Sequence, residues 1–492
     1  MKSLSDKLYS VDSIVQLEQI AIKQFSIPAY ELMKRAGEAV FNVIKMHYPE
    51  RKNILVLCGS GNNAGDGYVV ASLAKRAGFD VTVVSIIPPE TLNNEALLAY
   101  KDWLSLSKNS QPDLTLLDGA DIIIDALLGT GLSRNVSHQY ETWIKAVNTA
   151  AKPVIAVDIP SGLLADTGVI SGHAIKADKT VCFIGLKQGM YTAQAKDVCG
   201  QIILDSLALP AQIYEQVACS AHLLNAINYS LLPIRKASSH KGCFGHVLLV
   251  GGNDSMPGAL ILAATAALRA GAGLLTIITI AKHLTAISTA VPEAMIKTCE
   301  IDSVATLFDA PFINSVTHVA IGMGLGQDDW SLAMLQNCLQ LQKPILLDAD
   351  ALNLFAKHKL IIRSPVVITP HPGEAARLLN GTEIFASIDI QQNRFDAIKK
   401  LHALVNTVES CVVLKGSGTL LFDGQVMKVC NLGSAAMATP GMGDVLSGIC
   451  IALMAQHIKI TDAVELAVCL HAAAADYIAK DKTRGLLASD VV

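Results

Sequence analysis

Short, uninterrupted runs of Val, Ile and Leu recur along the chain, and no other feature limits its possible folds as strongly. In the first half of the sequence these runs alternate with helical stretches, at residues 54–58, 81–86, 122–126, 154–157 and 180–184. Strands that are apolar on both faces are typical of a parallel sheet covered by helices on both sides. The pattern therefore predicts an α/β domain, preceded by two helices in residues 10–47 that break at Pro28.

The second half of the sequence repeats this pattern with its own apolar runs, at residues 246–250, 274–279, 318–321, 345–348, 366–369, 411–415 and 419–422. Between the two sets, the alternation is lost over residues 211–239. A chain of 492 residues is long enough for more than one domain with its own core. We therefore predict two α/β domains, residues 1–216 and residues 217–492.

The longest apolar run, residues 259–280, raises the question of a membrane span, because the mean hydropathy of the chain is +0.41. Arg269, Gly271 and Gly273 interrupt this run. A spanning helix needs about 20 consecutive apolar residues, so we predict a buried helix over residues 258–269 followed by a central strand. Residues 1–6 contain no apolar segment typical of a signal peptide. We expect a cytoplasmic protein with no membrane partner.

Charge and cysteine content bear on two further classes of protein. The formal net charge is −4 and no basic stripe is present, so we expect no nucleic-acid partner. The eleven cysteines are scattered singly, with no Cys-x-x-Cys pair. This spacing is typical of reduced, buried thiols and disfavours a zinc site.

A glycine-rich segment separates the first apolar run from a helix that we predict over residues 68–77. It covers residues 59–67 and reads Gly-Ser-Gly-Asn-Asn-Ala-Gly-Asp-Gly. Strand, glycine loop and helix are typical of a Rossmann-like three-layer domain, whose glycines let the backbone approach a pyrophosphate. The spacing differs from Gly-x-Gly-x-x-Gly, and Asp80 precedes the second strand instead of ending it. An NAD dehydrogenase is therefore disfavoured, whereas a nucleotide ligand is not.

Three polar residues, Asn63, Asp125 and Ser161, follow or end strands of this domain. Ligands of open α/β sheets bind at the carboxyl ends of the strands, so we expect these side chains to meet at one point. Amide, carboxylate and hydroxyl oxygens together suit an alkali or alkaline-earth cation. Each residue alone is more typical of a turn or a helix cap, but the set of three favours a cation site.

Three motifs of the first half occur in a fixed order, Gly-Asn-Asn-x-Gly-Asp-Gly at residues 61–67, Asp-Ala-Leu-x-Gly-Thr-Gly-Leu at residues 125–132 and Val-Asp-Ile-Pro-Ser-Gly at residues 157–162. In this order they closely resemble the NAD(P)H-hydrate epimerase family, over most of residues 10–210. The resemblance implies a substrate, NAD(P)HX, in which water has added across a double bond of the reduced nicotinamide ring. The implied activity interconverts its R and S epimers.

The same resemblance implies roles for individual residues. Asp158 is the implied catalytic residue and faces the reacting ring, while Asn63, Asp125 and Ser161 bind potassium. The implied substrate-binding residues are Asp158 with Asn62, Asn63, Ala64, Gly65, Asp66, Gly129, Thr130, Gly131, Leu132, Ser133, Arg134 and Asn135. Ala64 stands where the family commonly has glycine, a change that we expect the turn to tolerate.

In the second half, residues 431–448 read Asn-Leu-Gly-Ser-Ala-Ala-Met-Ala-Thr-Pro-Gly-Met-Gly-Asp-Val-Leu-Ser-Gly. Residues 440–443 predict a flexible turn, and Asp444 opens an apolar helix over residues 445–456. Unpaired backbone N–H groups at the start of a helix favour an anion, and Asp444 is placed where a base would meet the group that reacts with it. The sequence contains no P-loop motif. His371, between two prolines, predicts a rigid and exposed imidazole.

Two further motifs, Thr-Pro-His-Pro-Gly-Glu at residues 369–374 and Lys-Gly-Ser-Gly-Thr at residues 415–419, precede Gly-Met-Gly-Asp-Val-Leu-Ser-Gly at residues 441–448. Together they resemble the NAD(P)H-hydrate dehydratase family, over about residues 235–490. The resemblance implies a ribokinase-like α/β fold and dehydration of the S epimer, with ADP and Mg²⁺, to give AMP and phosphate. It implies substrate contacts at Ala259, Gly324, His371 and the catalytic Asp444, and adenine-nucleotide contacts at Lys415, Gly416, Ser417, Gly418, Thr419 and Gly443.

One position departs from the expected pattern. Pro440 stands where we expect a smaller residue, and its ring fixes φ near roughly −65°. If the turn must flex to close on the nucleotide, turnover would suffer here.

A mechanism follows as a hypothesis. A hydroxyl on a saturated ring carbon leaves poorly as hydroxide but readily as phosphate, so dehydration gains from phosphorylation of the hydroxyl first. In this hypothesis Asp444 takes the hydroxyl proton, and the N–H groups of residues 441–443 stabilise the transferring phosphoryl group. Elimination then restores the reduced ring.

Two alternatives stay open. One is a ribokinase-like small-molecule kinase with a non-catalytic nucleotide-binding N-terminal domain, and the other keeps the first domain only as a nucleotide sensor or scaffold, because folds are reused without their chemistry. Against both, the two halves point to the same damaged metabolite. The expected partners are NAD(P)HX, an adenine nucleotide and further copies of the chain in a homo-oligomer. The preference for ADP over ATP rests on the resemblance alone.

Overall fold

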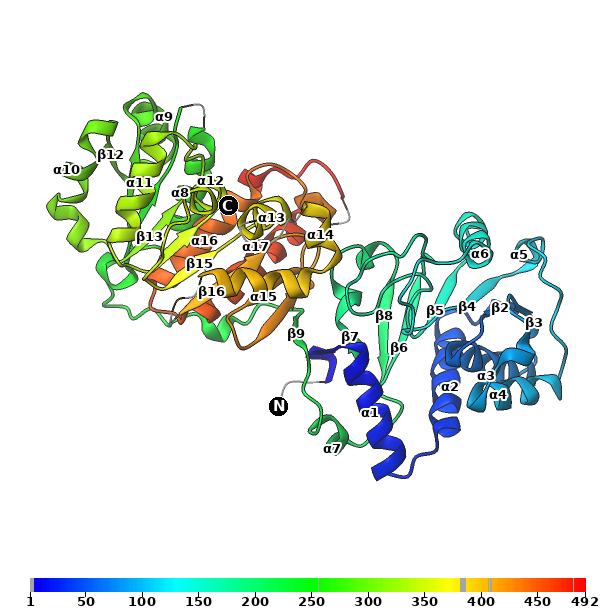
Figure 1. The fold of residues 1–492 in the computed structure, drawn as a ribbon. Helices are drawn as coiled ribbons and strands as arrows, with labels where there is room; N and C mark the ends of the chain where they lie inside the picture. Colours follow the sequence, from blue (N-terminus) through cyan, green and yellow to red (C-terminus); the bar gives the residue numbers. More distant parts are fainter. Residues whose placement is uncertain (1–3, 255, 381–385, 406, 408, 481) are drawn as a thin grey trace. The chain divides into compact units, whose positions relative to one another are not determined.

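The computed structural model describes residues 4–254, 256–380, 386–405, 407, 409–480 and 482–492 (Figure 1). The chain divides into two compact units, Met1–Leu223 and Leu224–Val492. Each unit is built around its own parallel sheet, so the predicted pair of α/β domains is confirmed as a fold class. Among the described residues, no helix combines the length and the apolar character that a membrane crossing requires.

The N-terminal sheet has the strand order β3-β2-β4-β5-β6-β8, and its neighbouring strands run parallel. Every predicted run of this half is a strand, with shifts of at most one residue at either end. The order reverses at β2, which has β3 on one side and β4 on the other, and such a switch point is where open α/β sheets bind ligands. The strands are β2 (Asn53–Cys58), β3 (Asp80–Ser85), β4 (Ile122–Ala126), β5 (Val154–Val157), β6 (Lys179–Phe183) and β8 (Gln201–Asp205).

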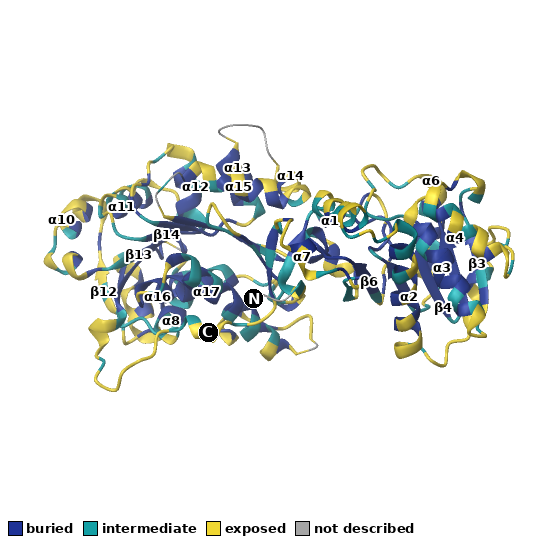
Figure 2. Ribbon diagram, turned by 90° about the horizontal axis from the view of Figure 1, so that it is seen from below, coloured by how far each residue is buried: buried dark blue, intermediate teal, exposed yellow. Residues whose placement is uncertain are grey.

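Alternate residues of these strands enter two different cores. In β2, Ile54 and Val56 belong to a core under α2, α3 and α4, whereas Leu55 and Leu57 belong to a core under α5 and α6. This period of two follows from the pleat of a strand, and it gives the three layers that Figure 2 shows as buried strands between half-buried helices. The helices are α1 (Val11–Gln24), α2 (Ala29–His47), α3 (Asn62–Arg76), α4 (Asn94–Leu104), α5 (Leu116–Gly119), α6 (His138–Thr149) and α7 (Ala211–Tyr214).

The two helices predicted before the sheet are α1 and α2, and Pro28 is the N-cap of α2. Ser10 caps α1, because its hydroxyl accepts from Ser13 N at 3.2 Å. The short strand β1 (Lys7–Tyr9) precedes α1 and pairs with β7 (Leu186–Lys187) and with β9 (Ala221–Leu224). These pairs join the start of α1 to a strand from the far end of the unit.

Helix α3 begins at Asn62, and the prediction that it begins at Tyr68 is wrong. Most of the glycine-rich segment is therefore helical, and the loop that precedes it is only residues 59–61. The glycines serve close packing: a methyl group added at Gly65 would lie 2.6 Å from Met33 Cε, and one added at Gly67 would lie 2.6 Å from Ala126 Cβ. Helix α3 can thus approach α2 and β4 closely.

The C-terminal unit has the strand order β12-β11-β10-β13-β14-β15-β16-β17-β18, parallel from β12 to β16 and antiparallel over the last two pairs. All the runs predicted for this half are strands, whereas β12 and β18 were not predicted. The strands are β10 (His246–Val250), β11 (Leu274–Thr279), β12 (Met295–Thr298), β13 (His318–Ile321), β14 (Ile345–Leu347), β15 (Val366–Ile368), β16 (Ser410–Leu414), β17 (Thr419–Phe422) and β18 (Met427–Cys430).

Helices cover both faces of this sheet, with α8, α16 and α17 on one side and α11, α12, α13 and α15 on the other (Figures 1 and 2). The apolar run at residues 259–280 divides as predicted, into α8 and β11. The helices are α8 (Pro257–Arg269), α9 (Leu284–Ala290), α10 (Val304–Phe308), α11 (Asp329–Gln340), α12 (Ala349–His358), α13 (Pro372–Leu379), α14 (Ser387–Gln392), α15 (Arg394–Val405), α16 (Met442–Ala455) and α17 (Ile460–Ala479).

Helix α16 begins at Met442, earlier than the predicted residue 445. Its N-cap Gly441 has φ +91°, a left-handed conformation that glycine adopts without strain. Gly443 and Asp444 are therefore part of the first helical turn instead of a flexible turn. The helix packs closely on α8, since a methyl group at Gly448 would lie 2.2 Å from Ala263 O.

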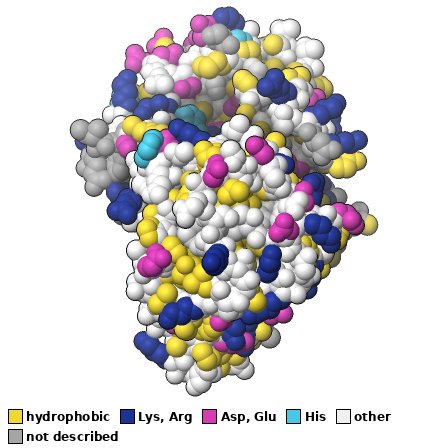
Figure 3. Space-filling model, turned by 90° about the vertical axis from the view of Figure 1, so that its right-hand side faces the viewer, with side chains coloured by type: hydrophobic (Ala, Val, Ile, Leu, Met, Phe, Trp, Pro, Cys, Tyr) yellow, Lys and Arg dark blue, Asp and Glu magenta, His cyan; other side chains and the backbone are white. Residues whose placement is uncertain are grey.

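Surface charge is mixed. On the face drawn in Figure 3, Lys and Arg side chains are interspersed with Asp and Glu. This distribution accords with the formal net charge of −4.

Candidate active sites

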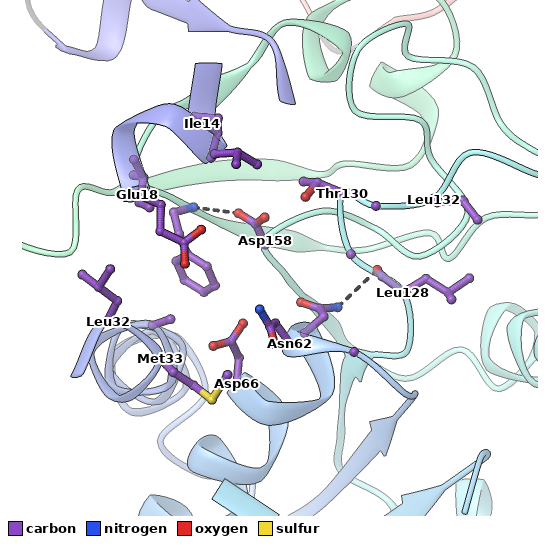
Figure 4. A pocket seen from close by; sticks show the side chains of 18 of the residues that line it. Ile14, Glu18, Leu32, Met33, Asn62, Asp66, Leu128, Thr130, Leu132 and Asp158 are labelled. Carbon is purple, nitrogen blue, oxygen red and sulfur yellow. Dashed lines mark hydrogen bonds between the residues drawn. The ribbon is translucent and has the colours of Figure 1, made fainter. Parts of the chain in front are cut away.

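A cavity of about 520 Å³ lies at the switch point of the N-terminal sheet (Figure 4). Loops after β2, β4 and β5 form its floor, and α1 and α2 contribute side chains from the other side. Of the residues predicted to bind the substrate, those that line the cavity are Asn62, Asn63, Asp66, Gly129, Thr130, Gly131, Leu132, Ser133, Arg134 and Asp158.

Three predicted residues are not among those that line this cavity. Ala64 is fully buried within α3, and Gly65 faces Met33. The side chain of Asn135 accepts a hydrogen bond from Ser171 Oγ at 3.2 Å.

Asp158 follows β5 with φ +65° and forms an ion pair with Lys187. Its carboxylate also accepts from Phe183 N at 2.9 Å. Lys187 is fully buried, and its ammonium donates to Phe183 O at 3.0 Å as well. Burial by itself would lower the pKa of Lys187, but the Asp158 carboxylate raises it above the ordinary value. The pair therefore places a fixed carboxylate at the cavity wall.

Lys187 and Glu18, which also lines the cavity, were not predicted as site residues. Lys187 is the last residue of the two-residue strand β7, two positions after Gly185. Glu18 lies within a helix that the sequence marks only as amphipathic.

Asn63, Asp125 and Ser161 meet beside this cavity, as predicted. Ser161 Oγ lies 2.5 Å from Asp125 Oδ1, and Ser161 N donates to Asp125 Oδ2 at 2.8 Å. Asn63 Nδ2 donates to Leu128 O at 3.2 Å, and Ser161 Oγ lies 3.2 Å from the same carbonyl. Burial raises the pKa of Asp125 to about 6, although hydrogen bonds from Ser161 and Leu127 oppose the shift.

The oxygen of the Asn63 side chain has no hydrogen-bond partner among the described residues, although it is buried. A buried acceptor without a partner costs about 1–3 kcal/mol. A bound cation would satisfy this oxygen, so the unpartnered oxygen supports a cation site. The oxygens that could hold such a cation are Asn63 Oδ1, Asp125, Ser161 Oγ and the Leu128 carbonyl.

In the C-terminal unit, Asp348 is the centre of a polar cluster at the carboxyl ends of β14 and β16. It is 1% exposed and accepts from Lys415 Nζ and from Ser447 Oγ, both at 2.8 Å. Lys415 Nζ also lies 3.8 Å from Glu374 Oε2. A methyl group added at Gly443 would lie 3.2 Å from Lys415 Nζ. The structure thus brings Lys415 and Gly443 together, and it adds Asp348, Glu374 and Ser447, which had no predicted role.

Asp444 is half-buried in the first turn of α16. Burial raises its pKa to about 7, the Asp348 carboxylate raises it further, and Lys415 opposes these effects. The first N–H groups of an α-helix have no partner within the helix, so a donor array and a carboxylate with a pKa near neutrality lie in one turn. This arrangement suits a general base beside an anion.

His371 is the N-cap of α13, and its ring is about half exposed. Nδ1 accepts from Gly373 N at 3.0 Å and from Glu374 N at 3.3 Å, while Glu374 Oε2 accepts from His371 N at 2.8 Å. Burial and then the Lys415 charge lower the pKa of His371. The ring is therefore neutral, with its proton on Nε2, and the predicted rigid, exposed imidazole is confirmed.

The loop at residues 415–419 joins β16 to β17 around a buried guanidinium. Arg394 is 0% exposed and donates to Leu414 O at 3.0 Å, to Lys415 O at 3.3 Å and to Gly418 O at 3.4 Å. Gly416 has φ +134°, and a methyl group there would lie 2.8 Å from the guanidinium. Burial lowers the pKa of Arg394 to about 10, which leaves the side chain charged at neutral pH. Arg394 was not predicted.

Ala259 and Gly324 lie side by side, since a methyl group at Gly324 would be 3.4 Å from Ala259 Cβ. The loop that follows is tied to α12, because Gly326 N donates to Asp350 Oδ2 at 2.9 Å. Asp350 in turn is one of the charges that raise the pKa of Asp444. These contacts connect Ala259 of α8 and Gly324 of the loop after β13 to the cluster around Asp348.

Comparisons with known proteins agree for both halves. The family model described as YjeF-related protein N-terminus matches residues 29–189, and the model described as NAD(P)H-hydrate dehydratase matches residues 247–492. A solved structure, the ADP/ATP-dependent NAD(P)H-hydrate dehydratase from Bacillus subtilis co-crystallised with ATP and Mg²⁺, is 32% identical and covers 53% of this chain and 90% of that chain, with a TM-score of 0.47.

Three relatives named bifunctional NAD(P)H-hydrate repair enzyme Nnr match nearly end to end. The protein of Coxiella burnetii is 41% identical over 98% of this chain and 97% of its own length. Those of Escherichia coli and Vibrio cholerae are 40% and 42% identical, each over 99% of this chain and over 93% and 97% of their own lengths. The chain therefore belongs to the family of bifunctional NAD(P)H-hydrate repair enzymes.

Proposed function

We propose that the protein repairs hydrated nicotinamide cofactors through two activities on one chain. The domain of residues 1–216 interconverts R- and S-NAD(P)HX, and the domain of residues 217–492 dehydrates the S form to NAD(P)H with ADP. The observation that carries the proposal is a carboxylate site in each unit, Asp158 in one and Asp444 in the other, within a chain of this family. Epimerisation supplies a stereospecific dehydratase with the form that it accepts.

In the N-terminal cavity, residues 129–134 and Asn62 enclose the substrate, and Asp158 faces the reacting ring. Loss of the hydroxyl leaves positive charge on the ring nitrogen and its neighbouring carbon. A carboxylate that is ion-paired with a buried lysine is placed to stabilise that charge. This is the role that the geometry supports for Asp158.

In the C-terminal site, the nucleotide lies along residues 415–419 and against Gly443. Asp444 removes the proton of the substrate hydroxyl, which attacks the terminal phosphoryl group of ADP. The N–H groups at the start of α16 stabilise the charge of the transferring group. The phosphate then leaves from the ring carbon, and the double bond of the reduced ring returns. Ala259, Gly324 and His371 position the ring, and the neutral imidazole offers a donor at Nε2.

The donor set also fits Mg²⁺. Asp348 and Glu374 are two carboxylates that Lys415 Nζ contacts, at 2.8 and 3.8 Å. Mg²⁺ is usually held by one or two carboxylates together with substrate phosphates. Asp348 and Glu374 would hold the ion, which supplies neutralisation of the phosphate charge.

The test offers separated R- and S-hydrated NADH to the protein, with and without ADP, and follows the absorbance of the reduced nicotinamide. We expect the S form to recover only with ADP, and the R form to recover at a rate above spontaneous epimerisation. A stable phosphorylated product from a vitamin precursor, without recovery of NADH, would instead indicate a small-molecule kinase. Recovery of the S form with no acceleration for the R form would leave the N-terminal unit as a scaffold.

We further propose that potassium occupies the site of Asn63, Asp125 and Ser161. The support is the unpartnered oxygen of Asn63 beside a buried carboxylate. The pKa of Asp125 in the folded protein is about 6, above the ordinary value of 3.8. Between these two pH values the folded protein keeps a proton that the unfolded chain has lost. In the absence of a cation, stability therefore falls as the pH rises through this window.

Potassium competes with this proton, so KCl is expected to raise Tm more above about pH 6 than below it. A ligand at a hundred times its Kd stabilises the folded state by about 2.7 kcal/mol. Choline chloride at equal ionic strength is the control. A Tm that responds equally to both salts, or a potassium response that survives in Asp125→Asn, would contradict the site.

A cytoplasmic location and a homo-oligomer are further parts of the proposal. The support for the first is that all eleven cysteines are free and nine of them are buried, as in proteins of a reducing compartment. Exposed apolar side chains such as Ile234, at 94%, and Tyr477, at 83%, accord with the second. Sedimentation equilibrium of the full chain tests the oligomer directly.

A further inference from the structure

Helix α1 carries a carboxylate in its apolar stripe. Its buried residues are Ile14, Leu17 and Ala21, which recur at the spacing of one helix face. Glu18 follows Leu17 and lies four residues after Ile14, so it belongs to the same face. A carboxylate there is costly unless it meets polar surroundings, and the side chain of Glu18 lines the 520 Å³ cavity of the N-terminal unit.

Three other carboxylates line the same cavity, Asp66 from α3, Glu95 from α4 and Asp158 from the end of β5. Figure 4 shows Glu18 and Asp66 pointing into the cavity on the side where Asp158 contacts Lys187. Asp158 is held by Lys187 and by Phe183 N–H. By contrast, the side chains of Glu18 and Asp66 make no hydrogen bond and no ion pair with any residue that the structure describes. They are free to meet a ligand.

The carboxylates Glu18, Asp66 and Asp158 outnumber the lysine that lies among them. Lys187 is the buried cation among these side chains, and it is already paired with Asp158. Burial, then Asp158 and Glu95, raise the pKa of Glu18, whereas Lys187 lowers it. Burial, then Asp158 and Glu18, raise the pKa of Asp66 well above its ordinary value. Carboxylates that crowd one site favour the uptake of a proton, so the surroundings of Glu18 and Asp66 suit groups that take up and release a proton.

We propose that Glu18 and Asp66 are the acid–base pair of the epimerisation. This inference rests on the proposed epimerase function. An epimerisation at the hydroxyl-bearing carbon needs a proton donor when the hydroxyl departs and a proton acceptor when water returns to the opposite face. Asp158 is paired with Lys187, so we assign it to stabilisation of the cationic ring and not to proton transfer.

The step balances in atoms and charge. The protonated member of the pair gives its proton to the hydroxyl, the carbon–oxygen bond breaks with loss of water, and the lone pair of the ring nitrogen forms a carbon–nitrogen double bond. Water then adds to the other face of that carbon, its proton passes to the carboxylate member, and the electron pair returns to the nitrogen. The proton has moved from one carboxyl to the other, which is the state required for the reverse reaction.

The experiment uses the full chain without ADP, so that the C-terminal site does not consume the product. Conversion of pure R-NADHX to the S form is followed by chromatography, and the spontaneous rate is subtracted. Glu18→Gln and Asp66→Asn are each expected to lower the rate by about 10²- to 10⁴-fold. The double variant is expected to lose little more, because the two groups act as a unit.

Two controls separate catalysis from folding. Asp12→Asn removes an exposed carboxylate from the same helix and is expected to keep the full epimerisation rate. ADP-dependent dehydration of S-NADHX by each variant reports the integrity of the C-terminal unit, and native-state hydrogen exchange of peptides from β4 and β5 reports that of the N-terminal unit. The pH–rate profile of the wild type is expected to be bell-shaped, and Glu18→Gln is expected to remove one limb, which a purely structural role would not do.

The outcomes also separate this inference from the proposed function. No acceleration by the wild type would overturn the epimerase function itself. A wild type that epimerises, together with Glu18→Gln and Asp66→Asn variants that keep its rate and pH profile, would overturn only the acid–base assignment. A loss confined to Asp66→Asn would exclude Glu18 from the pair.

Discussion

Asp158 and Asp444, the two carboxylates predicted to be catalytic, lie in different electrostatic surroundings. Asp158 is paired with a fully buried lysine. Asp444 is half-buried among carboxylates, and burial with the Asp348 charge raises its pKa to about 7. The first arrangement suits a fixed negative charge, and the second suits a group that gains and loses a proton near neutral pH.

The pH dependence of the dehydratase is expected to follow Asp444. A base must be ionised to act, so kcat/KM for the ADP-dependent reaction should rise with pH and level off above about pH 7. Initial rates with S-NADHX across this range measure it. In Asp444→Asn the rate should fall by about 10²- to 10⁴-fold, and the residual activity should not show the same rise with pH. An unchanged rate in this variant would remove Asp444 from the role of base.

Loss of the cation that pairs with Asp158 should weaken the N-terminal unit. Lys187→Met leaves a carboxylate at the cavity wall without its partner, and breaking a buried pair in this way costs about 3–5 kcal/mol. Native-state hydrogen exchange of peptides from β4 and β5 measures the loss. Lys145→Met is the matched control, because Lys145 pairs with Glu141 at the surface, where a pair contributes about 0–1 kcal/mol. Equal effects of the two variants would contradict the prediction.

At the scale of elements, two glycines and one buried arginine determine how the segments at the two proposed sites pack against their neighbours. Gly65 and Gly67 let α3 pack against α2 and β4, so the helix begins at Asn62 beside the cavity. Arg394 on α15 donates hydrogen bonds to the carbonyl groups of Leu414, Lys415 and Gly418, at the loop of residues 415–419. In both cases, the shape of a segment at a proposed site depends on a residue that packs against other parts of the protein.

Arg394→Met is expected to weaken nucleotide binding. The carbonyls of Leu414, Lys415 and Gly418 lose their donor, and a buried acceptor left unsatisfied costs about 1–3 kcal/mol, equivalent to about 5- to 150-fold in Kd. Titration calorimetry with ADP measures this loss. Arg394→Lys should recover only part of the affinity, since an ammonium cannot reproduce the fork of a guanidinium. Arg363→Met, at an exposed position, is the control. Epimerisation by the same protein should be unaffected, and a loss of both activities would indicate global unfolding instead.

At the scale of the whole molecule, the two units have separate hydrophobic cores and separate candidate sites. Each site takes all of its predicted residues from one unit. The two activities should therefore be separable by single substitutions.

A mixture of two inactivated variants tests this separation. Asp444→Asn should epimerise but not dehydrate, and Asp158→Asn should dehydrate only the S form. With both hydrate epimers and ADP present, neither variant alone should recover NADH from the R form faster than spontaneous epimerisation allows, but a mixture of the two should recover NADH from both forms. The recovery of NADH absorbance measures the outcome. Failure of the mixture, with each variant active in its own assay, would show that transfer between the sites requires a single chain.

The sequence by itself determined the features that depend on local order. Uninterrupted apolar runs predicted the parallel strands, because a strand buried on both faces must be apolar at every position. Polar residues at the ends of those runs predicted that Asn63, Asp125 and Ser161 meet, because carboxyl ends of parallel strands lie at one edge. The roles predicted for Asp158 and Lys415 came from the family resemblance. The order of the motifs along the sequence also distinguished the two halves of the chain.

Only the tertiary structure decided which distant side chains complete the sites. Glu18 and Lys187 enter one cavity because β1 pairs with β7 and places α1 beside it. Asp348 and Ser447 meet across 99 residues of sequence, and Arg394 lies under a loop that follows it by more than twenty positions. No local pattern marks such residues, since a charged residue within an amphipathic helix looks the same whether it faces water or a cavity. Their roles follow from packing. Packing removes water, and without water one charged group shifts the pKa of its neighbours strongly.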